Sequence, residues 1–134
     1  MAESRSKVLL VEDSKFLRIV NGRALTKAGY EVSTAEDGEQ ALRLANETRP
    51  DVVLLDMMIP KLSGPDVLKA LKSNPATMAI PVIVLTSLSQ KNEEKLKELG
   101  AAEYFEKSAL DLEQNPDRLA AAVEGVLRRA RPHK

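Results

Sequence analysis

Residues 52–56 read Val-Val-Leu-Leu-Asp, four apolar residues in a row followed by a carboxylate. Successive side chains of a strand point to opposite faces, so an unbroken apolar run predicts a strand that is buried on both faces. The runs Val8–Val11 and Val82–Leu85 repeat this pattern on either side. Strands of this kind are typical of a parallel sheet that is covered by helices on both sides.

The stretches between the apolar runs have helical spacing. Apolar residues recur three or four positions apart in 17–28, 41–45, 67–71 and 119–127. We expect Lys91–Leu99 to be a further helix, highly charged and with few apolar anchors. The predicted helix boundaries are Gly29, Asp37 with Gln40 in a capping box, Pro50, Gly64-Pro65, Asn74-Pro75, Gly100 and Asn115-Pro116.

Two shorter segments complete a regular alternation. Glu31–Ala35 alternates in polarity and Ala101–Phe105 is a short run, so we expect both to be strands. Strand and helix then alternate five times, and right-handed crossovers turn such a chain into a doubly wound sheet. The sequence predicts an α/β fold, a flavodoxin-like (βα)5 domain with a five-stranded parallel sheet in the order 2-1-3-4-5.

Length and composition limit the possible functions. The 134 residues suit one domain, and we expect an N-terminal extension at 1–6, the domain at 7–130 and a basic tail at 131–134. The 20 basic residues balance 20 acidic ones, which argues against a nucleic-acid binder that works by electrostatics. No apolar run approaches the length of a membrane span or of a signal peptide, and no cysteine is present. These features favour a cytoplasmic protein.

The residues after the predicted strands carry the chemistry. Ligands of doubly wound sheets bind at the carboxyl ends of the strands, next to the point where the strand order reverses. At these ends stand Glu12, Asp13, Asp56, Thr86 and Lys107. Carboxylates that meet there repel one another unless a cation joins them, and Mg²⁺ prefers oxygen ligands. Since Asp is also a nucleophile toward phosphorus, we expect a magnesium-dependent site for phosphoryl transfer.

Each of these residues also has a simpler interpretation. Glu12 and Asp13 alone could cap the helix that follows them, Thr86 could merely end a strand, and Lys107 could be a surface lysine. Tyr104 alone would be a core residue. The combination at four strand ends, in this order, favours the site over these separate roles.

Other nucleotide and phosphate chemistries fit the same residues poorly. The loop after the first strand lacks the glycine pattern of a Rossmann site or a P-loop, and its acids would repel the phosphate of FMN. A phosphatase of the haloacid dehalogenase type needs a second Asp two residues after the nucleophile, where this chain has Met58. The single histidine, His133, excludes a histidine-based triad or zinc site.

The chain resembles the receiver domain of two-component response regulators over residues Ser6 to Ala130. The matching motifs are Glu12-Asp13, Asp56-Met57-Met58-Ile59-Pro60 with Gly64, Ile80 to Ser87, and Lys107. The resemblance implies that Asp56 accepts a phosphoryl group from a histidine kinase. It also implies that Asp13, Asp56 and the Met58 carbonyl bind Mg²⁺, with Glu12 acting through water. Thr86 and Lys107 would contact the phosphoryl group.

The resemblance also implies a switch. Tyr104 matches the aromatic switch position, and Thr86 would move toward the phosphoryl oxygens and leave space for its ring. The face built by the charged helix 91–99, the fifth strand and the last helix would then change and bind a downstream protein. The expected partners are a sensor histidine kinase or phosphotransfer protein and that target. We expect a signalling module and no enzyme.

Several alternatives remain open from the sequence. A pseudo-receiver would bind partners without phosphorylation, although the complete acidic set disfavours it. An Asp- and magnesium-dependent phosphatase is a further alternative. The chain is either a single-domain regulator or a receiver cut from a longer protein.

Overall fold

The computed structural model describes residues 6–57, 59, 61, 63–86, 97–106 and 117–130. Five parallel strands form one sheet in the order β2-β1-β3-β4-β5. The strands are β1 (Lys7–Val11), β2 (Glu31–Ala35), β3 (Val52–Asp56), β4 (Val82–Thr86) and β5 (Glu103–Glu106). The helices are α1 (Lys15–Lys27), α2 (Gly38–Thr48), α3 (Gly64–Ser73) and α6 (Asp117–Ala130). The order and direction of the strands confirm the predicted doubly wound sheet.

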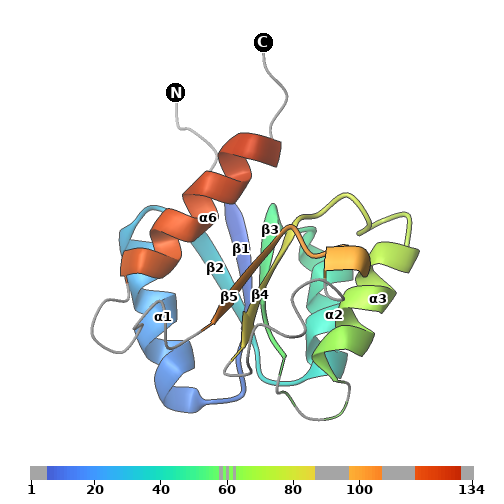
Figure 1. Ribbon diagram of the computed structural model, residues 1–134. Helices are drawn as coiled ribbons and strands as arrows, with labels where there is room; N and C mark the ends of the chain where they lie inside the picture. Colours follow the sequence, from blue (N-terminus) through green and yellow to red (C-terminus); the bar gives the residue numbers. More distant parts are fainter. Residues whose placement is uncertain are drawn as a thin grey trace.

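Helices cover both faces of the sheet (Figure 1). On one face, α2 and α3 pack through Ala41, Ala45 and Leu68 against alternate residues of the central strands. On the other face, α1 and α6 pack through residues such as Leu25 and Val123 against the remaining strand residues. The two apolar layers explain why β1, β3 and β4 need apolar residues at successive positions.

Burial differs between the centre and the edge of the sheet. All residues of β3 are buried, as the run at 52–56 predicts. β2 pairs only with β1 in the described sheet and exposes Glu31 and Thr34, so it is a strand as predicted, although its burial does not follow a strict two-residue alternation. The buried strands β1 and β3 lie side by side at the centre of the sheet. The carboxyl ends of these two strands, called the carboxyl edge below, are where the sequence predicts the site.

The helix starts follow side-chain caps. The predicted cap of α2 is confirmed, since Asp37 Oδ1 accepts a hydrogen bond of 2.8 Å from the Gln40 amide. Gln40 reciprocates one residue earlier than a standard capping box, accepting from the Glu36 amide at 2.7 Å. In α3 the cap is Ser63, so the helix begins at the predicted Gly64-Pro65, with Pro65 at the second helical position.

The boundaries of the fifth strand differ from those predicted. The fifth strand begins at Glu103 and ends at Glu106, whereas the sequence predicted Ala101–Phe105. Gly100 has φ +113, and after this turn Ala102 donates to Val82 O before the strand pairing begins at Glu103. Most of the predicted charged helix 91–99 and the start of the last helix at Asn115-Pro116 lie outside the described residues.

Candidate functional site

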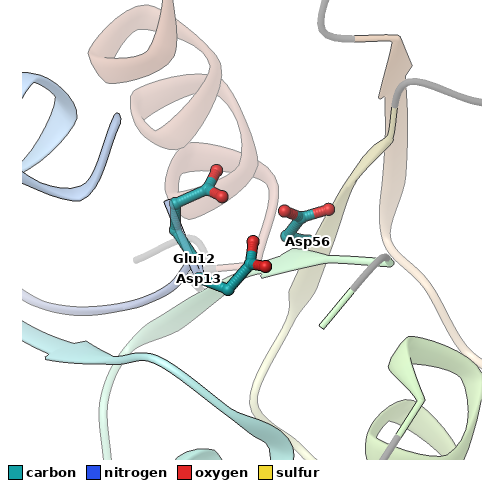
Figure 2. Close-up of side chains that lie close together, drawn as sticks. All are labelled: Glu12, Asp13 and Asp56. Carbon is teal, nitrogen blue, oxygen red and sulfur yellow. The ribbon is translucent and has the colours of Figure 1, made fainter. Parts of the chain in front are cut away.

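Three carboxylates meet at the carboxyl edge of the sheet (Figure 2). Val11 of β1 pairs with Leu55 of β3, so the next residues, Glu12 and Asp56, also emerge side by side. One oxygen of each of Glu12, Asp13 and Asp56 lies within 4.8 Å of the other two. Glu12 is 2% exposed and Asp56 3% exposed, whereas Asp13 is exposed. The strand ends thus bring together the acidic residues that the sequence singled out.

The loop after β1 holds Glu12 firmly in place. Its amide donates to Ala35 O at 2.9 Å, which ties the loop to the end of β2. Its carboxylate oxygen Oε2 accepts a hydrogen bond of 3.2 Å from the Ser14 amide. The helix cap itself is Ser14, whose Oγ accepts from Leu17 N at 3.3 Å. The alternative that Glu12 and Asp13 serve only to cap α1 is therefore wrong.

The loop after Asp56 turns back sharply. The Met57 amide donates to Leu85 O of β4 at 3.0 Å, and the Gly64 amide donates to Met57 O at 3.2 Å. A Cβ atom at position 64 would lie 2.5 Å from Met57 Cα. Glycine is required at 64 because the start of α3 touches the backbone directly after Asp56.

The donor set fits a hard divalent cation. Three carboxylates at this spacing repel one another, and burial of Glu12 and Asp56 strengthens the repulsion. The N-terminus of α1, next to the cluster, offers only a partial positive charge. Mg²⁺ takes oxygen ligands and binds through one or two carboxylates with waters and phosphate oxygens. The cluster therefore has the chemistry that a magnesium ion requires.

The remaining predicted residues differ in how much of them the structure describes. Tyr104 lies in β5, is 8% exposed and belongs to the apolar layer under α2 and α3. Thr86 ends β4 opposite Glu106, which puts its backbone at the carboxyl edge, but its side chain lies outside the described part. Met58 and Lys107 lie outside the described residues altogether.

The sequence interpretation missed Arg18. Its Nη1 donates to the carbonyl oxygens of Glu12 at 2.9 Å and of Asp13 at 3.3 Å. The sequence offered a weak signal only, a cation one helical turn after the Ser14 cap. Nothing in apolar periodicity shows that this side chain folds back onto the loop.

The fold and the site define a receiver domain, and comparisons with known proteins agree. The response regulator receiver domain family matches residues 8–124, so the chain belongs to this family of two-component signalling modules. The chain is 40% identical to the transcriptional regulatory protein CpxR of Escherichia coli over 93% of its length and 50% of the relative. It is 35% identical to the alkaline phosphatase synthesis transcriptional regulatory protein PhoP of Bacillus subtilis, over 92% and 49%.

A solved structure supports the same conclusion. The chemotaxis response regulator CheY4 of Vibrio cholerae superposes with a TM-score of 0.82 at 32% identity, over 92% of this chain and 99% of that one. The chain spans about half the length of the transcriptional regulators named above. Within the described part of the chain, no helix has the length and apolar character needed to cross a bilayer.

Proposed function

We propose that this receiver domain accepts a phosphoryl group on Asp56 with the help of Mg²⁺. The observation that carries the proposal is the convergence of Glu12, Asp13 and Asp56 within 4.8 Å at the carboxyl edge, in a chain of the receiver family. Asp13, Asp56 and the backbone carbonyl of Met58 would hold the ion, and Glu12 would act through water. When bound, Mg²⁺ neutralises charge on the phosphoryl oxygens.

The phosphoryl donor is a phosphohistidine of a sensor kinase or a phosphotransfer protein. A carboxylate oxygen of Asp56 attacks the phosphorus, a P–O bond forms and the P–N bond breaks. The leaving imidazole nitrogen takes up a proton. Thr86 and Lys107 contact the transferred group, one by a hydrogen bond and the other by its charge. The protein then acts as a signalling module, since its own side chain is the acceptor.

Mass spectrometry tests the acceptor. The protein is incubated with Mg²⁺ and phosphoramidate, and we expect it to gain the mass of one phosphoryl group. Asp56→Asn should gain none. Asp51→Asn is the matched control, because Asp51 precedes β3 just as Asp56 ends it, and it should be phosphorylated like the wild type. Equal uptake by Asp56→Asn would show that another residue is the acceptor.

Phosphorylation would change the surface through Thr86 and Tyr104. The new group adds about −1.5 to −2 charges and strong acceptors, toward which Thr86 moves. Tyr104 is 8% exposed, and it is expected to turn further into the space that Thr86 leaves. The charged stretch 91–99, β5 and α6 would make up the output face. Within its described part, Glu103 of β5 pairs with Arg129 of α6 at 3.0 Å.

Tyrosine fluorescence tests this switch. The chain has two tyrosines and no tryptophan, so Tyr30→Phe leaves Tyr104 as the only emitter of this kind. We expect phosphorylation of that variant to change its fluorescence, and the same treatment of Tyr30→Phe/Asp56→Asn to leave it unchanged. Tyr104 is not the switch residue if the phosphorylated variant keeps the emission of the free one.

The output is a protein–protein contact in phosphorelay signalling. The curated relatives named above are transcriptional regulators of about twice the length. This chain contributes the receiver, proposed to span residues 7–130 between the short extension 1–6 and the basic tail 131–134. Its balanced charge disfavours direct binding of this chain to nucleic acid.

A further inference from the structure

Arg18 reaches from α1 back to the loop that carries two of the acidic residues. Its Nη1 donates to the carbonyl oxygens of Glu12 at 2.9 Å and of Asp13 at 3.3 Å. Its Nη2 lies 3.5 Å from Glu36 Oε2. The Arg18 side chain as a whole is 17% exposed, whereas the Glu36 side chain is 61% exposed. One side chain thus joins the ends of β1 and β2.

The two carbonyls that Arg18 binds have a special relation to Asp13. Each peptide unit is planar, and the units that contain the Glu12 and Asp13 carbonyls flank the Asp13 Cα atom. Once both planes are fixed, the direction of the Asp13 Cα–Cβ bond is fixed as well. A guanidinium suits this task because Nη1 carries two N–H donors in a fixed plane, one for each carbonyl, while Nη2 faces Glu36. Hydrogen bonds to both carbonyls restrain the two planes, and with them the direction of the Asp13 Cα–Cβ bond.

Direction matters because of the ion that Asp13 is proposed to bind. Mg²⁺ demands nearly ideal octahedral geometry and dehydrates reluctantly, so a ligand that rotates away is poorly compensated. Asp13 is exposed, and the surrounding core does not hold its side chain as it holds Glu12 and Asp56. Of the three carboxylates, it depends most on its backbone for orientation.

We propose that Arg18 is a positioning residue of the magnesium site, which orients Asp13 through the Glu12 and Asp13 carbonyls. The inference rests on the proposed function, since it assigns a further residue to that site. Two effects of Arg18 oppose each other there. Its positive charge by itself weakens cation binding, whereas its hydrogen bonds strengthen binding by ordering the loop. The sign of the change on removal of Arg18 therefore separates orientation from simple electrostatics.

Magnesium titration of three variants tests the proposal in the absence of any phosphodonor. Arg18→Met removes the charge and the hydrogen bonds and keeps most of the stem. We expect its Mg²⁺ affinity to fall about 10- to 100-fold, the usual range when a residue that orients a metal ligand is lost. Arg18→Lys keeps the charge without the planar guanidinium. Its Mg²⁺ affinity should lie between those of Arg18→Met and the wild type.

Arg23→Met is the matched control. Arg23 is an exposed arginine on the same helix, so its replacement removes the same charge at a position further from the site. If orientation dominates, Arg23→Met should bind Mg²⁺ within about twofold of the wild type or slightly more tightly, as expected for a screened surface charge.

Amide hydrogen exchange of the metal-free protein gives a second readout. We expect exchange at the Glu12 and Ser14 amides to be faster in Arg18→Met than in the wild type, because the carbonyls between them lose their donor. The amides of β3 should exchange at the wild-type rate. This pattern shows a loosened loop within a folded domain, and uniform acceleration would instead show general destabilisation and count against the proposal.

The outcomes separate this inference from the proposed function. If the wild type binds Mg²⁺ and takes up phosphate but Arg18→Met binds Mg²⁺ equally or more tightly, the positioning role is wrong and the function stands. If the wild type does neither, the proposed function itself fails. Should Arg18→Met not fold, Arg18→Lys carries the test, and wild-type affinity in that variant overturns the proposal.

Discussion

Charged residues are arranged differently at the two ends of the strands, the amino edge and the carboxyl edge of the sheet. At the amino edge, Lys7 and Asp51 are joined twice: the Lys7 amide donates to Asp51 Oδ2 at 2.7 Å, and the Asp51 amide donates to Lys7 O at 2.8 Å. The lysines there bind backbone carbonyls, since Lys7 Nζ donates to Thr48 O and Lys72 Nζ to Ile80 O. At the carboxyl edge, three carboxylates gather within 4.8 Å.

The difference separates structural charges from functional ones. At the amino edge each of these charges serves the fold, because it closes the end of a strand or holds a turn carbonyl. At the carboxyl edge, selection for stability alone would not gather like charges, two of them buried, in one place. Stability that is given up in this way is typical of a site that binds a ligand of opposite charge.

The largest expected effect is on magnesium binding. Asp13→Asn removes one charged oxygen ligand, and we expect the Mg²⁺ affinity to fall about a hundredfold, the upper end of what even a supporting residue costs. Asp51→Asn changes the same residue type at the other edge and should leave the affinity unchanged. Isothermal titration of both variants makes the comparison. Equal affinities in the two variants would remove Asp13 from the site.

A second prediction concerns the shape of the carboxyl edge. Gly64→Ala places a Cβ 2.5 Å from Met57 Cα, and we expect the free energy of unfolding to fall by about 1–3 kcal/mol as the loop after Asp56 shifts. Gly22→Ala is the control, since nothing lies within 4 Å of its Cβ and it is inside α1. It should stabilise by about 0.5–1 kcal/mol. Denaturant unfolding would contradict this if both variants moved in the same direction.

The sequence was sufficient for the parts of the molecule that depend on patterns along the chain. The apolar runs predicted the strands, and parallel strands place their carboxyl ends at one edge, so the meeting of Glu12, Asp13 and Asp56 followed from topology. The capping interpretation of the acids failed because Ser14, one residue later, has the better geometry for that role. The local sequence pattern alone does not show which of several adjacent polar residues caps a helix.

Features that depend on the path of a side chain were not predictable. Arg18 is one of several cations on α1, and only the fold shows that its guanidinium meets the Glu12 and Asp13 carbonyls. The start of β5 was likewise misplaced, because it depends on where the turn at Gly100 brings the chain to β4. Contacts between residues distant in space decide both features.

A third prediction concerns the stability of the metal-free protein. Like charges whose oxygens lie within 4.8 Å of one another repel by about 1 kcal/mol even in water, so Asp13→Asn should raise the free energy of unfolding by about 1 kcal/mol. Asp51→Asn should instead lower it by less than about 1 kcal/mol, because the hydrogen bond to the Lys7 amide loses its charge. Thermal unfolding in a chelating buffer measures both. Destabilisation by Asp13→Asn would show that its charge serves the fold.

The smallest effect is expected at Lys72, on the amino edge. Burial lowers the pKa of this lysine below its ordinary value, while its Nζ donates to Ile80 O at 2.6 Å and Met78 O at 3.1 Å. Since the side chain is only partly buried, Lys72→Met should lower the free energy of unfolding by less than about 1 kcal/mol at neutral pH, with no change in Mg²⁺ affinity.

The pH dependence of that variant gives the sharper test of the amino edge. Between the lowered pKa of folded Lys72 and its ordinary value, the unfolded chain binds more protons than the folded one. The contribution of Lys72 to stability therefore rises with pH through this window, and the stability difference between the wild type and Lys72→Met should widen toward alkaline pH. A difference that stays constant or narrows would mean that burial does not penalise the charge of Lys72, and that its hydrogen bonds to the carbonyls before β4 fully replace its hydration.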